Sequence, residues 1–182
     1  TSGPAHLALA SARWFAGRGL PAVRTELASA RSSVRAEDRY QIDQALGSYA
    51  WTAGDTAAAI AAFDSVIAYQ SDNPSGLHGR ASALALAGRY EQAFALYEAA
   101  VRVRTGITEL RCDFARDLLG AGRAATAKSQ LDEAKILDPE NPTAEALRAW
   151  AALESGDAQG AGSHAEQALA WGPWSDLARI VQ

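Results

Sequence analysis

Apolar and charged residues alternate in short groups along the whole 182-residue chain, and continuous runs of β-branched residues are missing. Most of the apolar residues are small, alanine above all, and only six prolines interrupt the sequence. Alanine favours helix more than any other residue, whereas proline breaks helices. The pattern therefore predicts an all-α protein. We expect helices at about 4–16, 20–35, 40–53, 56–69, 74–87, 90–103, 108–121, 124–137, 142–155 and 158–170.

Short glycine-containing turns interrupt this pattern at a constant interval. They read TAGDT, LAGRY, GAGRA and ESGDA. Their glycines lie 34 residues apart and are Gly54, Gly88, Gly122 and Gly156. Equal steps without an insertion indicate stacked structural repeats. In these turns glycine can adopt a positive φ that closes the preceding helix, while Asp55 and Asp157 can cap the following one.

Small and large side chains keep the same register around the four turns. Small residues lie seven positions before each turn glycine and five positions after it: Gly47, Ala81, Ala115 and Ala149, then Ala59, Ala93, Ala127 and Ala161. Nine positions after the glycines come Phe63, Tyr97, Leu131 and Ala165. We expect the paired helices to cross closely at the small residues, with the larger side chains filling the space beside them. Ala165 makes the last layer thin, and we expect Trp171 and Trp174 to pack near it.

This pattern resembles the tetratricopeptide repeat, a 34-residue helix–turn–helix unit. The segments QALGSYAWTAGDTAAAIAAF and AGRYEQAFALYEAAV carry the Leu-Gly pair and the alanine four residues before an aromatic residue, and Pro139 and Pro173 occupy the terminal proline position. The resemblance implies a right-handed superhelical solenoid in which stacking supplies the core. Its four repeats would cover about 40–73, 74–107, 108–141 and 142–175.

The two flanks are expected to extend the solenoid. Residues 1–39 are predicted to form a degenerate N-terminal helical hairpin, because Val23 precedes Ala59 by 36 residues instead of 34. Residues 174–182 are interpreted as a capping helix or as the start of a truncated further repeat. The chain contains no methionine and begins with Thr-Ser-Gly-Pro, so we expect a processed chain or a piece of a longer one.

The resemblance also implies a function, because tetratricopeptide proteins hold a partner protein or peptide in a concave groove lined by the first helix of each repeat. With Tyr40, Pro74, Thr108 and Pro142 as first positions, the second, fifth, ninth and twelfth residues face that groove. Seven of the residues in these positions are our candidate binding residues: Gln44, Ser48, Trp51, His78, Ser82, Arg116 and Trp150. Tryptophan and arginine are frequent interface anchors, and a wide, partly aromatic groove suits a polypeptide segment.

Each candidate also has a purely structural interpretation. Trp51 and Trp150 can cover neighbouring helices, and His78 can be an ordinary polar residue. Arg116 can pair with Asp113 or Asp117 on its own helix. Cys112, the single cysteine, is interpreted as a small buried residue.

The carboxylate-clamp subtype of the family is rejected. That subtype uses lysine, asparagine and arginine to hold a C-terminal carboxylate. The matching positions here are Gln44, Ser48, Gly79, Glu109 and Asp113. Two acids therefore replace two bases, and a peptide carboxylate would be repelled.

Other classes of function are weighed against this one. The three histidines, His6, His78 and His164, lie on different helical pairs, with no nearby carboxylate–histidine spacing. Neither a phosphate-binding loop nor a metal-ligand cluster is evident, so we expect neither catalysis nor a cofactor or metal. A net charge of −4 without a basic stripe speaks against nucleic acid, and no apolar run reaches the ~18 residues of a membrane span.

The expected protein is a soluble scaffold, cytoplasmic or periplasmic, that forms part of a larger bacterial assembly. Two alternatives remain. One is a self-associating module that forms a homo-oligomer through the C-terminal helix, where Leu177, Ile180 and Val181 share one face. The other is a regulatory domain attached to an enzyme or an export machine.

Overall fold

The structure is a computed structural model that describes residues 3–172, and within that range it is all-α, with ten α-helices, one short 3₁₀ helix and no strand. The helices are α1 (Gly3–Phe15), α2 (Gly19–Ser33), η1 (Ala36–Asp38), α3 (Arg39–Thr52), α4 (Thr56–Tyr69), α5 (Pro74–Leu86), α6 (Tyr90–Val103), α7 (Thr108–Gly120), α8 (Ala124–Leu137), α9 (Pro142–Glu154) and α10 (Ala158–Trp171). Each α-helix begins and ends within two residues of its predicted range. The predicted helix at 174–182 lies outside the described residues.

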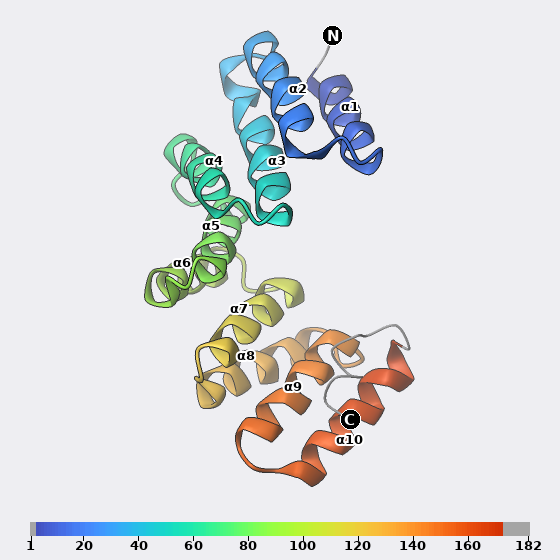
Figure 1. The fold of residues 1–182 in the computed structure, drawn as a ribbon. Coiled ribbons are helices and arrows are strands. Elements are labelled where there is room, and N and C mark those ends of the chain that lie inside the picture. The colour runs from blue at the N-terminus through green and yellow to red at the C-terminus, as the bar shows by residue number, and fades with distance from the viewer. Residues whose placement is uncertain (1–2, 173–182) are drawn as a thin grey trace. The chain divides into compact units, whose positions relative to one another are not determined.

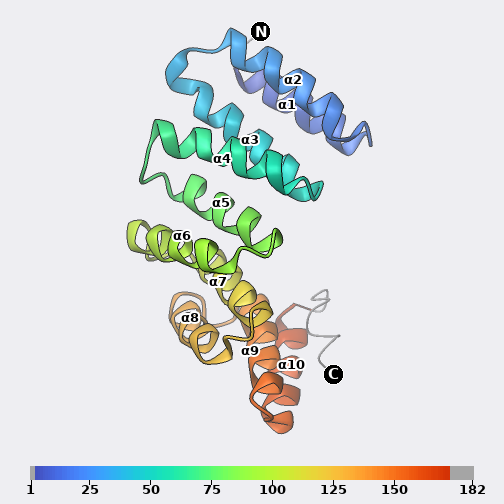
Figure 2. The same cartoon turned by 60° about the vertical axis from the view of Figure 1, so that its left-hand side comes forward.

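The chain divides into two compact units, residues 1–103 and 104–182. In the first unit α1 pairs with α2, α3 with α4, and α5 with α6, and these hairpins stack through the contacts of α2 with α3 and of α4 with α5 (Figures 1 and 2). The second unit has two hairpins, α7 with α8 and α9 with α10, in which α9 packs against both α7 and α8. None of the described helices has the length and apolarity needed to cross a membrane.

The four turn glycines adopt the predicted backbone conformation. Their φ angles lie between 73° and 78°, a region that favours glycine because it has no Cβ. Asp55 and Asp157 cap the following helices, since their Oδ1 atoms accept hydrogen bonds from the backbone N–H groups of Ala58 at 3.0 Å and of Gly160 at 2.8 Å. In these two turns the glycine thus ends one helix and the aspartate begins the next, whereas arginine follows the glycine in the turns at Gly88 and Gly122.

Phe63 shows how the small residues shape the core. Its side chain is 2% exposed and lies against two glycines, Gly47 on α3 and Gly79 on α5. A Cβ atom on Gly47 would lie 2.8 Å from the ring, and one on Gly79 would come closer still. In the second unit the buried Leu131 has the corresponding place on α8, and the residue that corresponds to Gly79 is the buried Leu147. A large ring therefore lies against glycine in the first unit, whereas two leucines occupy the corresponding positions of the second.

This matching of sizes predicts the effect of Gly79→Ala. The new methyl group overlaps the Phe63 ring, and overpacking of this kind costs about 1–3 kcal/mol, more than the ~1 kcal/mol that alanine gains over glycine in a helix. We expect a net loss of stability on the order of 1 kcal/mol, partly recovered by Phe63→Leu in the same chain. Urea unfolding of the single and double variants, followed by circular dichroism, measures this coupling.

Gly162→Ala is the matched control, because Gly162 lies in α10 and nothing lies within 4 Å of the position of its missing Cβ. Its stability should rise by up to ~1 kcal/mol from helix propensity alone. Equal effects of the two glycine substitutions, or strictly additive effects of Gly79→Ala and Phe63→Leu, would contradict the packing argument.

Candidate partner-binding faces of the two units

The seven predicted groove residues all lie on the first helices of their hairpins and are divided between the two units. Three of them, Gln44, Ser48 and Trp51, lie on α3, and His78 and Ser82 lie on α5. Arg116 and Trp150 lie on α7 and α9 of the second unit. Each unit therefore carries its own part of the set.

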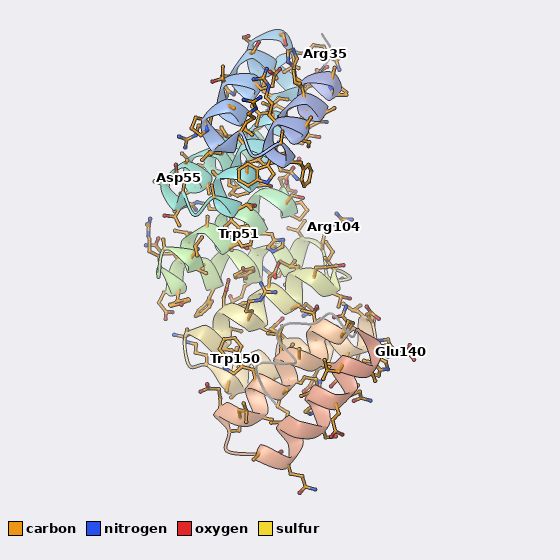
Figure 3. All side chains as sticks on the ribbon, turned by 45° about the vertical axis from the view of Figure 1, so that its right-hand side comes forward. Arg35, Trp51, Asp55, Arg104, Glu140 and Trp150 are labelled. Atoms are coloured by element: carbon orange, nitrogen blue, oxygen red, sulfur yellow. The ribbon has the colours of Figure 1, made fainter. Side chains whose placement is uncertain are left out.

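Trp51 is the largest exposed side chain of the α3 set. It lies near the C-terminal end of α3 and is 41% exposed, so part of the indole is packed and part faces solvent (Figure 3). Ser48, one turn before it, is exposed and donates a hydrogen bond of 3.1 Å to the carbonyl oxygen of Gln44. Helix α3 also packs against α5, and both helices belong to the first unit.

His78 and Ser82 are connected to the core through Tyr97 of α6. The fully buried Tyr97 places its hydroxyl 2.9 Å from Ser82 Oγ, and its ring centroid lies 5.9 Å from that of His78. Both α5 side chains are half-buried. The sequence register placed Tyr97 in the core, but it gave no sign that its hydroxyl reaches the α5 face. These contacts fix the positions of two candidate binding residues.

In the second unit both candidates make contacts within their own helices. Arg116 Nη1 lies 2.6 Å from Asp113 Oδ1, which is the ion pair that the structural interpretation anticipated. Trp150 Nε1 donates a hydrogen bond of 3.1 Å to Glu154 Oε1 and the residue is half-buried. A partner on this face would meet an arginine already paired with a carboxylate.

Cys112 lies in a predicted groove position but is 3% exposed. Burial, together with the neighbouring Asp113 carboxylate, raises the pKa of its thiol to about 11. The thiol therefore stays protonated at neutral pH and is a poor nucleophile. Cys112 is a buried filler, as the structural interpretation held.

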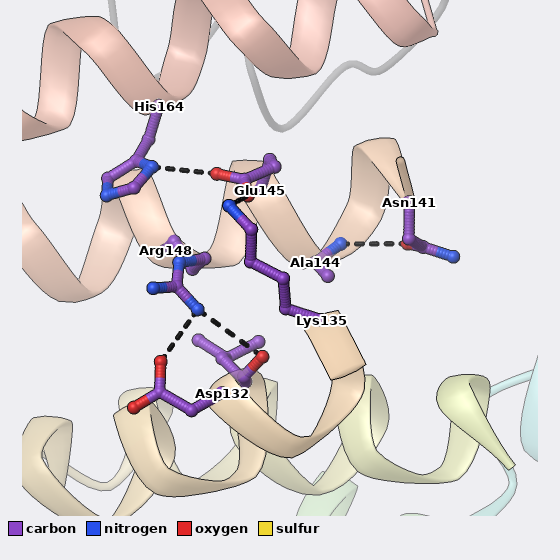
Figure 4. Close-up of polar contacts among 8 residues, drawn as sticks. Asp132, Lys135, Asn141, Ala144, Glu145, Arg148 and His164 are labelled. Atoms are coloured by element: carbon purple, nitrogen blue, oxygen red, sulfur yellow. Dashed lines mark hydrogen bonds and ion pairs between the residues drawn. The ribbon is translucent and has the colours of Figure 1, made fainter. Parts of the chain in front are cut away.

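Two histidines meet carboxylates, which corrects the expectation drawn from their sequence positions. His164 Nδ1 lies 2.7 Å from Glu145 Oε2, and the other oxygen of Glu145 lies 2.7 Å from Lys135 Nζ (Figure 4). In the first unit His6 Nδ1 lies 2.6 Å from Glu26 Oε1. Each pair is separated by about twenty residues along the chain and forms only because the hairpin folds back, so local spacing could not reveal it.

Glu145 is the most deeply buried charged group described. It is 1% exposed and joins α9 to α8 through Lys135 and to α10 through His164. Carboxylates this deeply buried are normally paired, as this one is. Within residues 3–172, no three of the His, Cys, Asp and Glu side chains are placed to hold a metal ion. We therefore interpret Glu145, with Lys135 and His164, as a structural link that joins α9 to α8 and α10.

Hairpins of this length, stacked through small residues at a 34-residue period, define an α-helical repeat protein. Residues 45–106 and 112–176 match the sequence profile named Tetratricopeptide repeat. The chain belongs to the tetratricopeptide repeat family. No curated protein sequence matches it significantly.

Solved structures show the same fold at low sequence identity. The crystal structure of TTC0263, a thermophilic tetratricopeptide protein of Thermus thermophilus, has a TM-score of 0.79 at 18% identity over 98% of this chain and 96% of that one. A tetratricopeptide protein from Parabacteroides merdae has a TM-score of 0.79 at 15% identity, covering 98% and 70% of the two chains. YrrB, described as having an unusual peptide-binding site, reaches 0.69 at 16% identity over 96% and 89%.

Proposed function

We propose that this protein is a non-catalytic scaffold that holds a polypeptide segment on the first-helix faces of its hairpins, as a module of a larger bacterial assembly. The family supports this proposal, since tetratricopeptide proteins generally mediate protein–protein interactions. The peptide-binding site described for YrrB, a protein of the same fold, gives the proposal further support.

The observation that carries the proposal is the half-exposed Trp51 on a face without formal charge. The predicted groove positions of α3 and α5 hold glutamine, serine, histidine, alanine and tryptophan, but no Asp, Glu, Lys or Arg. Tryptophan supplies a large apolar contact area, while the hydroxyl and amide groups of Ser48 and Gln44 can pair with a peptide backbone. Such a face suits an extended segment that contributes one apolar anchor and uncharged neighbours.

On the second unit the proposed contacts are Trp150 and Arg116. Arg116 already has a carboxylate neighbour, so it would orient a partner through the N–H groups that remain. His78 and Ser82, held by Tyr97, would do the same on the first unit. Anchors held in place before binding lose less conformational entropy when the partner arrives.

Trp51→Ala tests the proposal. Truncation of a tryptophan that anchors an interface costs about 2 kcal/mol or more, which corresponds to roughly 30-fold weaker binding. A partner captured on the purified chain and identified by mass spectrometry would be titrated calorimetrically against the native chain, Trp51→Ala and the double variant with Arg116→Ala. Circular dichroism should show unchanged helicity, because neither side chain is buried.

Ile136→Ala serves as the control for this experiment. Ile136 is 73% exposed on α8, a second helix, so its truncation removes exposed apolar area from outside the proposed faces. Affinity should stay within about twofold of the native value, as expected for a side chain outside the interface. Unchanged affinity in the Trp51 and Arg116 variants, or equal weakening by Ile136→Ala, would remove the assignment.

A further inference from the structure

The second unit contains a cavity that none of the seven groove residues lines. It has a volume of about 310 Å³ and lies between α8, α9 and α10. Much of its wall consists of alanines, among them Ala125 and Ala152, whose short side chains leave the space open. The volume is at the lower end of the range of small-molecule sites, which begins at about 300 Å³.

Three nitrogen-bearing side chains, one from each helix, line this cavity: Lys128, Arg148 and His164. Lys128 is exposed and has no ion pair or hydrogen bond with any residue of the described chain. His164 is held by Glu145 through Nδ1, which leaves its second ring nitrogen without a partner among the described residues. In Figure 4 that nitrogen points to the same side of the picture as the outer guanidinium nitrogen of Arg148 that does not contact Asp132.

Arg148 is fixed in place from one side only. Its Nη1 donates to Asp132 Oδ1 at 2.8 Å and to the carbonyl oxygen of Leu131 at 3.4 Å. Its side chain is 17% exposed, and its buried Nε–H has no hydrogen-bond partner among the described residues. A guanidinium has five N–H donors, so several remain unused after these two contacts.

The formal charges around the cavity cancel, so a ligand with a single negative charge is accommodated more easily than one with two. Arg148 is matched by Asp132, and Glu145 by Lys135. Lys128 is a cavity-lining cation without an ion pair among the described residues, and Asp157, which caps α10, puts a carboxylate on the cavity wall. A doubly charged phosphate would add two negative charges beside the Asp157 carboxylate, whereas a single carboxylate adds one and can pair with Lys128.

We propose that this cavity binds a carboxylate carried on a short aliphatic chain. The carboxylate would pair with Lys128 and with the unused N–H groups of Arg148, and the alanine walls would contact the methylene groups. Free aliphatic acids and the side chain of a glutamate in a partner both present this chemistry. The site shares no residue with the proposed groove and does not depend on it.

Titration of the 182-residue chain, followed by ¹H–¹⁵N NMR, tests the site with two probes. Butyrate stands for a free acid, and N-acetyl-glutamate-N-methylamide stands for a glutamate side chain. We expect saturable shifts of amide signals from α8, α9 and α10, with Lys128→Gln weakening binding by about fivefold or more and Ala152→Leu abolishing it by filling the cavity. Tighter binding of the capped glutamate assigns the site to a partner side chain, and tighter binding of butyrate to a free acid.

Arg104→Gln is the matched control, because it removes one exposed cation of the same unit that does not line the cavity. Its affinity for both probes should equal that of the native chain. Lys128 is exposed and unpartnered within the described chain, so its substitution leaves the fold intact even if Ala152→Leu does not fold. Absence of saturable binding, equal effects of Lys128→Gln and Arg104→Gln, or tighter binding of inorganic phosphate than of either probe would overturn the proposal.

Discussion

Replacement of Phe63 by alanine is expected to lower the free energy of unfolding of the first unit by about 3–5 kcal/mol, the usual range for a buried phenylalanine. Helices α3, α4 and α5 meet on this ring, and two of the surfaces it touches are the glycines Gly47 and Gly79. Glycines have no side chain that could move into the space left by the ring. The cavity therefore stays open, which places the expected loss toward the upper part of that range.

Urea unfolding at constant temperature, followed by the far-ultraviolet circular dichroism signal, measures this loss. Phe15→Ala is the control, because it makes the same chemical change at a side chain that is 87% exposed on α1. A surface substitution of this kind changes stability by about 0.5 kcal/mol or less. Similar losses for Phe63 and Phe15 would show that the ring does not fill the junction of the three helices.

Glu145→Ala is expected to destabilise the second unit by about 3 kcal/mol. Removal of one partner from a buried ion pair costs about 3–5 kcal/mol, because the other charge remains buried and unpaired. Here the side chains of Lys135 and His164 are 41% and 30% exposed, so water can reach them once the carboxylate is gone. This access to water places the effect at the lower end of the range.

Thermal or urea unfolding of the variant, compared with Glu154→Ala, measures the effect. Glu154 lies on the same helix but is exposed and accepts a hydrogen bond from Trp150, so its loss should cost less than about 1 kcal/mol. A change at Glu145 no larger than the change at Glu154 would contradict the role of Glu145 as a tie between α8, α9 and α10.

The fold could be predicted from the sequence because its strongest determinants are local and recur. A glycine with positive φ and an aspartate that caps the next helix act within about five residues. Both can therefore be recognised from the sequence of the turn. The small residues before and after each turn, such as Gly47 and Ala59, recur in step with these turns. The helix boundaries at Gly54 and Asp55 therefore followed directly from the spacing.

The side-chain contacts could not be predicted in the same way. His164 meets Glu145, and Ser82 meets Tyr97, across a hairpin, and nothing in the intervening residues signals either contact. The ion pair between Arg116 and Asp113 also depends on side-chain packing. Spacing placed the seven groove candidates on the first helices, but contact with a partner depends on a second molecule.

Phe63 lies against Gly79, whereas the corresponding positions of the second unit hold Leu131 and Leu147, so the hairpins of the two units are not interchangeable. If a genetic rearrangement joined α4 directly to the hairpin that begins with α9, the Phe63 ring would be driven against Leu147 where it now meets bare backbone. The junction at Phe63 thus disfavours this rearranged order, and a chain shuffled in this way would be less stable whether or not a ligand is present.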